Sequence, residues 1–162
     1  MNARDAWEYA SFVITALGLP VAILFFAWDQ LKERDNEDEA AYQLLSDAYN
    51  EFLRVVLAHP DLHLRTNEPL LNPTTEQTER MLVIFDMLIS LFERAFLVAF
   101  KPRMSETEAR RWNSWDDYMR EWCHRDDFYA ALPLLLRGED PEFQDYIRRI
   151  AREERGAPIQ IG

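Results

Sequence analysis

A run of twenty residues without a charged side chain, from Tyr9 to Trp28, constrains this chain more than any other feature. Each residue of an α-helix adds about 1.5 Å, so the run would cover roughly 30 Å, the thickness of the hydrocarbon core of a bilayer. Tyr9 and Trp28 stand at its two ends, where aromatic rings favour the level of the lipid headgroups. The run therefore predicts a single transmembrane helix with Tyr9 and Trp28 at the membrane interfaces.

Two other structures explain this run less well. A cleaved signal peptide needs a basic start and a small residue near the cleavage site, but Arg4 is offset by Asp5 and Glu8, and bulky Phe25 occupies the position that should be small. A buried helix of a soluble domain usually carries a polar stripe, which this run lacks. We therefore favour a membrane anchor.

The charges beside the run favour one orientation. Arg4 precedes it, whereas Lys32 and Arg34 follow it, and basic residues are retained on the cytoplasmic side. This predicts an N-terminus outside and a cytoplasmic C-terminal domain. The one cysteine, Cys123, cannot form an intramolecular disulfide, which agrees with a reducing compartment.

Small residues recur along one face of the predicted anchor, at Ser11, Thr15, Gly18 and Ala22. Such a face lets two helices approach closely in lipid, and Pro20 would bend the helix beside it. A homo-oligomer that forms through this face is one hypothesis. The other is that the helix only anchors the chain.

Charge argues against one class of partner. The net charge is −11, and from residue 29 to residue 100 there are 6 basic and 14 acidic side chains. An acidic surface of this kind is repelled by nucleic-acid phosphates and by anionic headgroups. We expect no nucleic-acid partner.

The remaining patterns predict an all-α fold, because no stretch alternates long enough to indicate a strand. We expect one N-terminal transmembrane helix that continues into a charged stalk and a small bundle of about four to five helices. The predicted divisions are the anchor at 1–28, the stalk at 29–41, the helical domain at 42–155 and a disordered tail at 156–162.

Helix boundaries in the domain follow from apolar periodicity, caps and prolines. A first helix begins near residue 42 and ends at His59-Pro60, and residues 60–73 form a connection without periodicity. Capping boxes predict helices at about 75–100 and 106–124. A short helix is expected at 127–136, bent or stopped at Pro133. Asp140 and Pro141 begin a last helix, which ends at Gly156.

Two of these helices invite other interpretations. Residues 81–100 are apolar enough for a second membrane span, but Asp86, Glu93 and Arg94 make insertion costly, so we expect a buried helix. Helix 106–124 carries an aromatic row that could form a ligand cage or a groove for a partner, although this spacing is more typical of a core. The row consists of Trp112, Trp115, Met119 and Trp122.

No catalytic or cofactor motif is present, so we predict no catalytic residue, cofactor or metal site. The nearest candidate for a pocket is a set of charged residues, namely Asp47, Glu51, Glu93 and Arg94. Carboxylates four residues apart on a helix could act as general acid and base, but an acidic solvent-exposed face is the ordinary interpretation.

Two further pairs have weak signals. His59 and His63 have the spacing of zinc ligands on a helix, but Pro60 breaks the helix that this spacing requires. Cys123 and His124 could pair as nucleophile and base, yet neighbouring residues on a helix project away from each other.

Several segments together resemble a group of uncharacterised bacterial single-pass membrane proteins with an N-terminal anchor and a small helical cytoplasmic domain. The segments are the anchor, residues 44–53, 91–96, 112–122 and 143–147. The resemblance implies the bacterial inner membrane as the location. It rests on packing patterns and assigns no activity and no site residues.

These observations favour a membrane-anchored helical module that recruits or regulates a protein partner, rather than an enzyme. The alternative is a membrane-tethered enzyme or small-molecule sensor. Its site would be assembled between helices from Asp47, Glu51, Glu93 and Arg94 with His59 and His124.

The anchor hypothesis predicts the topology of the chain. A reporter active only in the cytoplasm, fused after Gly162 in a bacterial host, should give a signal, and deletion of residues 1–28 should release the chain from membranes. A signal from a periplasm-specific reporter instead would reverse the orientation. A truncated chain that still sediments after a high-salt wash would implicate residues 81–100 in membrane contact.

Overall fold

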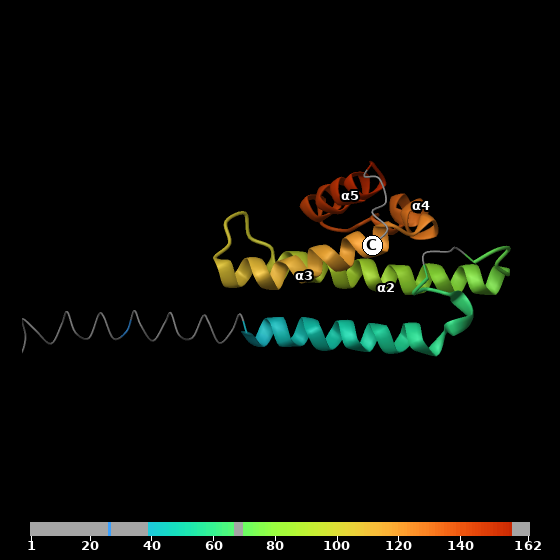
Figure 1. Ribbon diagram of the computed structural model, residues 1–162, viewed down its shortest axis with the longest axis horizontal. Coiled ribbons are helices and arrows are strands. Elements are labelled where there is room, and N and C mark those ends of the chain that lie inside the picture. The colour runs from blue at the N-terminus through green and yellow to red at the C-terminus, as the bar shows by residue number, and fades with distance from the viewer. Residues whose placement is uncertain (1–25, 27–38, 67–69, 157–162) are drawn as a thin grey trace, which may run out of the picture. The chain divides into compact units, whose positions relative to one another are not determined.

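The computed structural model describes residues 26, 39–66 and 70–156 (Figure 1). The predicted anchor lies outside them, apart from Phe26, and so do Tyr9 and Trp28, the small-residue face at Ser11, Thr15, Gly18 and Ala22, most of the predicted stalk, and the predicted tail after residue 156. The chain divides into two compact units, residues 1–41 and 42–162. None of the helices in the described part is both long and apolar enough to cross a membrane.

All regular structure in the described residues is helical, which confirms the all-α class. Residues 42–58 are helical and are followed by a single 3-10 turn, η1 (Pro60–Leu62). The other elements are α2 (Thr75–Ala99), α3 (Glu106–Cys123), α4 (Asp126–Leu135) and α5 (Pro141–Gly156).

Both predicted capping boxes are formed. The Thr74 hydroxyl accepts a hydrogen bond from the Gln77 N–H, and the Gln77 side chain accepts one from the Thr74 N–H, at 3.2 and 3.0 Å. At α3 the Glu108 carboxylate accepts from the Ser105 N–H at 2.7 Å. A hydrogen bond from Lys101, with the Ser105 contacts, lowers the pKa of Glu108 to about 2. These local bonds satisfy N–H groups that a helix start otherwise leaves free, so both starts could be located from sequence.

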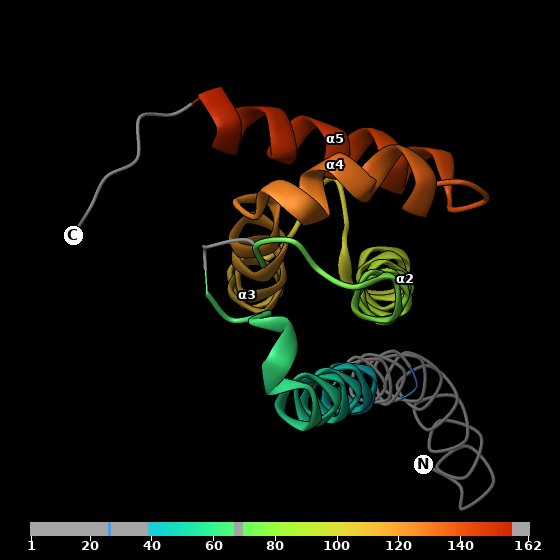
Figure 2. The same ribbon diagram turned by 90° about the vertical axis from the view of Figure 1, so that its right-hand side faces the viewer.

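The helices form three layers (Figure 2). Helix 42–58 lies below α2 and α3, and α4 and α5 cover the opposite side of that pair. Trp122 lies where the layers meet, with its ring centroid 5.7 Å from Phe52, 6.2 Å from Phe85 and 6.0 Å from Phe128. One indole therefore contacts helix 42–58, α2 and α4.

The aromatic row of α3 is core, as its spacing indicates. Trp112, Trp115, Met119 and Trp122 are each 5% exposed or less. At the other end of α3, Trp112 packs edge-on against Phe96 and Phe100 of the α2 end, and its Nε1 donates to the Tyr146 hydroxyl at 3.1 Å. The ligand-cage interpretation is therefore wrong, because no face of this row is open to solvent.

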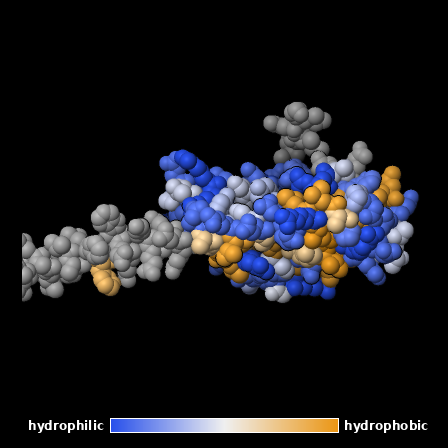
Figure 3. All heavy atoms as spheres, turned by 90° about the horizontal axis from the view of Figure 1, so that it is seen from below, coloured by the Kyte–Doolittle hydropathy of each residue, from blue (hydrophilic) through white to orange (hydrophobic). Residues whose placement is uncertain are grey.

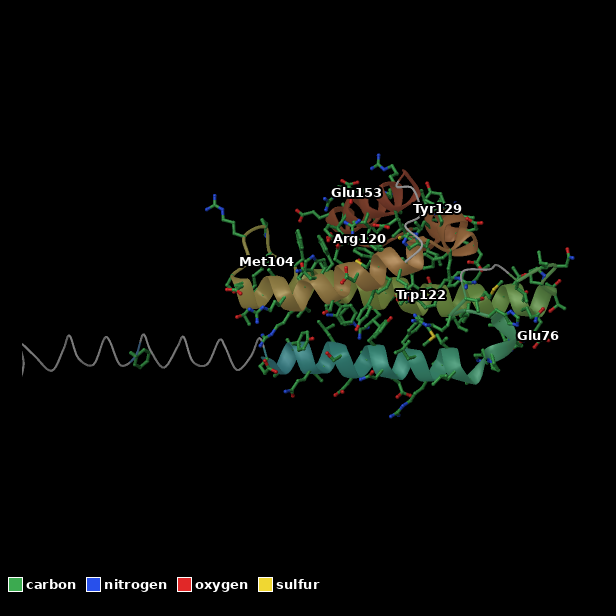
Figure 4. The ribbon with its side chains drawn as sticks, viewed as in Figure 1. Glu76, Met104, Arg120, Trp122, Tyr129 and Glu153 are labelled. Carbon is green, nitrogen blue, oxygen red and sulfur yellow. The ribbon has the colours of Figure 1, made fainter. Side chains whose placement is uncertain are left out.

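Charged side chains join α3 to α5 outside the aromatic contacts. Arg120 of α3 donates to Glu153 at 2.9 Å and to Glu154 at 2.7 Å, and it also pairs with Asp116 of its own helix (Figure 4). The Tyr146 hydroxyl of α5 donates to the same Asp116 carboxylate. The two helices are thus held in register by directional contacts as well as by packing.

The structure refines the sequence prediction at two places. The short helix predicted at 127–136 is α4, and of the two alternatives at Pro133, a bend or a stop, the stop is wrong, because α4 continues to Leu135. Pro133 is exposed, so the loss of its N–H leaves one carbonyl unbonded at the surface, where water can replace the donor. The connection 60–73 is also more than a loop, because η1 directs Leu62 and Leu64 into the core, 0% and 3% exposed.

Replacement of Trp115 by Ala should lower the free energy of unfolding by about 3–5 kcal/mol, because a buried indole would leave a cavity among Tyr49 and Tyr118. The matched change Asn113→Ala, at an exposed position of the same helix, should alter it by less than about 0.5 kcal/mol. Urea denaturation followed by circular dichroism measures both. Equal stabilities would show that the α3 row is not core.

Candidate functional site

The four charged residues of the predicted pocket do not converge. Asp47 and Glu51 are exposed on helix 42–58, and Glu51 pairs with Arg54 of its own helix at 3.1 Å. Arg94 is exposed on α2, whereas Glu93, about 100° around that helix, is half-buried against the α4–α5 connection. No described contact joins any two of them, so the geometry does not support a shared acid–base site.

Glu93 instead stabilises the start of α5. Its carboxylate accepts a hydrogen bond from the Asp140 N–H, while the Asp140 side chain accepts from the N–H groups of Glu142 and Phe143 at 2.9 and 3.0 Å. The Asp140 N-cap predicted from sequence is thereby confirmed. The link to Glu93 joins two segments distant in sequence and could not be read from periodicity.

Glu139, next to this contact, has an unusual pKa. Burial, then the hydrogen bond and charge of Glu93, and then the charge of Asp86 raise the pKa of Glu139 from 4.5 to about 7. Raised carboxylate pKa values occur at catalytic sites, but they also arise where acidic groups are crowded for structural reasons. Here the partner of Glu139 is occupied in holding α5, which favours the structural explanation.

The histidines belong to different contacts. Nδ1 of His59 lies 3.3 Å from a guanidinium nitrogen of Arg80, and His63 follows η1 in the left-handed conformation with φ 51°. The side chain of His124 lies 3.1 Å from Glu154, and no described contact joins it to His59 or His63. Within the residues that the structure describes, no three or more His, Cys, Asp or Glu side chains are arranged to hold a metal ion.

Cys123 is a core residue. The thiol is 0% exposed, and burial, with the charge of Glu154, raises its pKa to about 12. A thiol with such a pKa is protonated at neutral pH, and the thiolate is the nucleophilic form. His124 points to Glu154 instead, so the two neighbours do not form a nucleophile–base pair.

An apolar groove lies at the corner after helix 42–58. Its volume is about 480 Å³. It is lined by Leu53, Val56, Leu57, His59, Pro60, His63, Leu64, Arg65 and Thr66. Leu57 is 78% exposed, and apolar surface gathers beside helix 42–58 in the space-filling view (Figure 3). We refer to it as the corner groove.

A buried arginine holds one wall of the corner groove in place. Arg125 is 4% exposed, and it donates to the backbone carbonyls of His63 and Thr66 while forming two hydrogen bonds to Asp127, at 3.0 and 2.6 Å. A buried guanidinium needs partners for its donors, and here each terminal and ε nitrogen has one. Arg125 thereby ties residues 63–66 to the start of α4.

A second arginine holds the turn from the other side. Arg80 of α2 donates to the Asp61 carboxylate at 2.8 Å. Burial is the largest single effect on the pKa of Asp61 and raises it, but the charge and hydrogen bond of Arg80 act with further hydrogen bonds in the opposite direction. Their sum is larger, so the pKa of Asp61 is lowered. The Gln77 amide also donates to the Asp61 carbonyl. Sequence gave no signal for Arg80 or Arg125, because both sit in charged surroundings like those of many surface arginines.

No family model, no curated protein and no solved structure matches this chain. The site must therefore be interpreted from its own geometry.

The environment of Glu139 predicts a pH dependence. Because its folded-state pKa is raised, the folded chain binds more protons between pH 4.5 and about 7, and stability falls as pH rises through that window. Glu139→Gln, which mimics the protonated form, should raise the melting temperature above pH 7, and this gain should vanish toward pH 4.5. The control Glu142→Gln, at an exposed position, should show no such window. A pH-independent difference would refute the crowded-carboxylate explanation.

Proposed function

We propose that this chain is a membrane-anchored interaction module. Residues 9–28 hold it at the cytoplasmic face of the membrane, and the helical domain binds an apolar segment of a protein partner in the corner groove. The observation that carries the proposal is the groove itself, about 480 Å³ lined mainly by Leu, Val and Pro side chains. Cavities of this size and lining are typical of binding sites for apolar groups.

The charges at the groove favour an apolar occupant. Arg65 at the rim already pairs with Glu121 at 3.0 Å, and Arg80 beside the turn pairs with Asp61. A charged partner segment would have to break one of these pairs or remain unpaired. An uncharged segment needs neither, and it would cover Leu57, which is otherwise left in water.

The groove also has a fixed shape. Arg125 holds residues 63–66 to α4, and Arg80 holds Asp61 and His59 to α2. Binding to a preformed surface loses less conformational entropy than binding to a mobile one. A recruiting or regulatory module requires such a surface and needs no reactive group.

A photo-crosslinking residue placed at Leu57 in the full-length chain should capture one discrete protein in native membranes, whereas the same residue at Asn113 should not. Asn113 is exposed on α3, away from the groove. Leu53→Ser, within the groove, should lower the capture several-fold while circular dichroism stays unchanged.

Three results would contradict this proposal. They are identical adducts at Leu57 and Asn113, adducts with lipid only, or capture at Leu57 that is insensitive to Leu53→Ser.

A further inference from the structure

A second apolar surface lies on the other side of helix 42–58, between that helix and α2. It consists of Leu44, Ala48 and Val55 from helix 42–58 and Val83, Met87 and Val98 from α2. Leu44 is 71% exposed, Val83 61%, Val98 48% and Met87 45%. We call this surface the seam. It is distinct from the corner groove, and the inference drawn from it does not rest on the proposed partner or anchor.

The contacts of each helix place these residues on one side. On α2, Phe85 contacts Phe128 of α4 and Phe96 contacts Phe143 of α5, and helix 42–58 lies on the other side of α2 (Figure 2). Met87 and Val98 each follow one of these rings by two residues, about 200° around the helix, so they lie on the side of α2 turned away from α4 and α5.

On helix 42–58 the aromatic contacts fix the opposite edge. Tyr49 stacks on Tyr118 of α3 with centroids 4.4 Å apart, and Arg111 of α3 lies over the Tyr42 ring. Leu44 and Val55 are on the flank away from these residues, which is the flank next to α2. The exposed apolar side chains of the two helices therefore border the same seam.

Opposite charges stand at the two edges of the seam. Asp47 on helix 42–58 and Arg94 on α2 are both exposed, and neither takes part in a hydrogen bond or ion pair in the described part of the chain. The helices run antiparallel (Figure 1), and His59 meets Arg80 at one end. We count residues along each helix from that contact, at a rise of about 1.5 Å per residue. By this count Asp47 and Arg94 lie at nearly the same height along the helix axes, within roughly one helical turn of each other.

We propose that a second copy of this chain covers the seam. A two-fold axis parallel to the seam would place helix 42–58 of each copy against α2 of the other, in antiparallel orientation. This operation preserves the level of each residue along the axis, so Asp47 faces Arg94 of the partner subunit, and the pair forms twice. The apolar residues of the two seams then close on each other between the charged pairs, as in a four-helix bundle.

Charge favours this occupant over a lipid surface. Asp47 and Glu51 lie along one edge of the seam, and both would meet anionic headgroups if the seam lay on a membrane. A second copy presents Arg94 to that edge instead. The seam is therefore complementary to itself.

Charge reversal in the full-length chain tests the proposal. Two differently tagged copies of the same variant are co-expressed, and the recovery of one tag with the other is measured. Asp47→Arg and Arg94→Asp should each lower recovery roughly tenfold, since like charges then face each other. The double variant, which restores opposite charges, should recover the association.

Matched apolar substitutions provide a control. Met87→Asp should weaken the association, whereas Leu134→Asp should not, because Leu134 is 51% exposed on α4, which lies on the other side of the α2 and α3 layer (Figure 2). Circular dichroism of each variant checks that the fold is retained.

Four results would overturn the proposal: no co-recovery of the unmodified chains, no rescue in the double variant, equal effects of Met87→Asp and Leu134→Asp, or co-recovery that is insensitive to all charge changes. The last would indicate association through another segment.

Discussion

The position of Trp122 is the constraint on which the rest of the domain depends. Its ring meets Phe52 from helix 42–58, Phe85 from α2 and Phe128 from α4, so one side chain sets the spacing of three helices around α3. Tryptophan buries a large apolar area, and edge-to-face contacts between rings add a preferred geometry to that burial. Without this indole the three neighbouring helices would share a cavity and lose their common support.

Hydrogen bonds from arginines fix the positions of segments that the core packing alone would leave undefined. Hydrophobic burial has no direction, whereas the hydrogen bonds of Arg125 to His63 and Thr66 fix where the chain after η1 must lie. That segment forms one wall of the corner groove. Arg120 has the same role between α3 and α5. The proposed binding function thus uses surfaces that the core positions and the arginines shape.

Local signals predicted most of the described helices. Thr74 with Gln77 and Ser105 with Glu108 satisfy each other's backbone groups within one turn, so these starts are encoded by residues three apart. The buried row of α3 was readable for the same reason, since a helix repeats every 3.6 residues. The burial of Leu62 and Leu64 in the connection 60–73 could not be predicted in this way, because these two residues follow no local period.

The sequence by itself therefore determined the all-α class, the helix starts and the aromatic core of α3, and its apolar run at 9–28 predicts an anchor beyond the described residues. Only the tertiary structure decided which charged residues meet. Glu93 accepts a hydrogen bond from Asp140 and has no contact with Asp47. Arg125, which no sequence pattern marks, is buried and holds one wall of the corner groove. The reason is physical: caps and periodicity act within a few residues, whereas the partner of a charge is set by how whole helices pack.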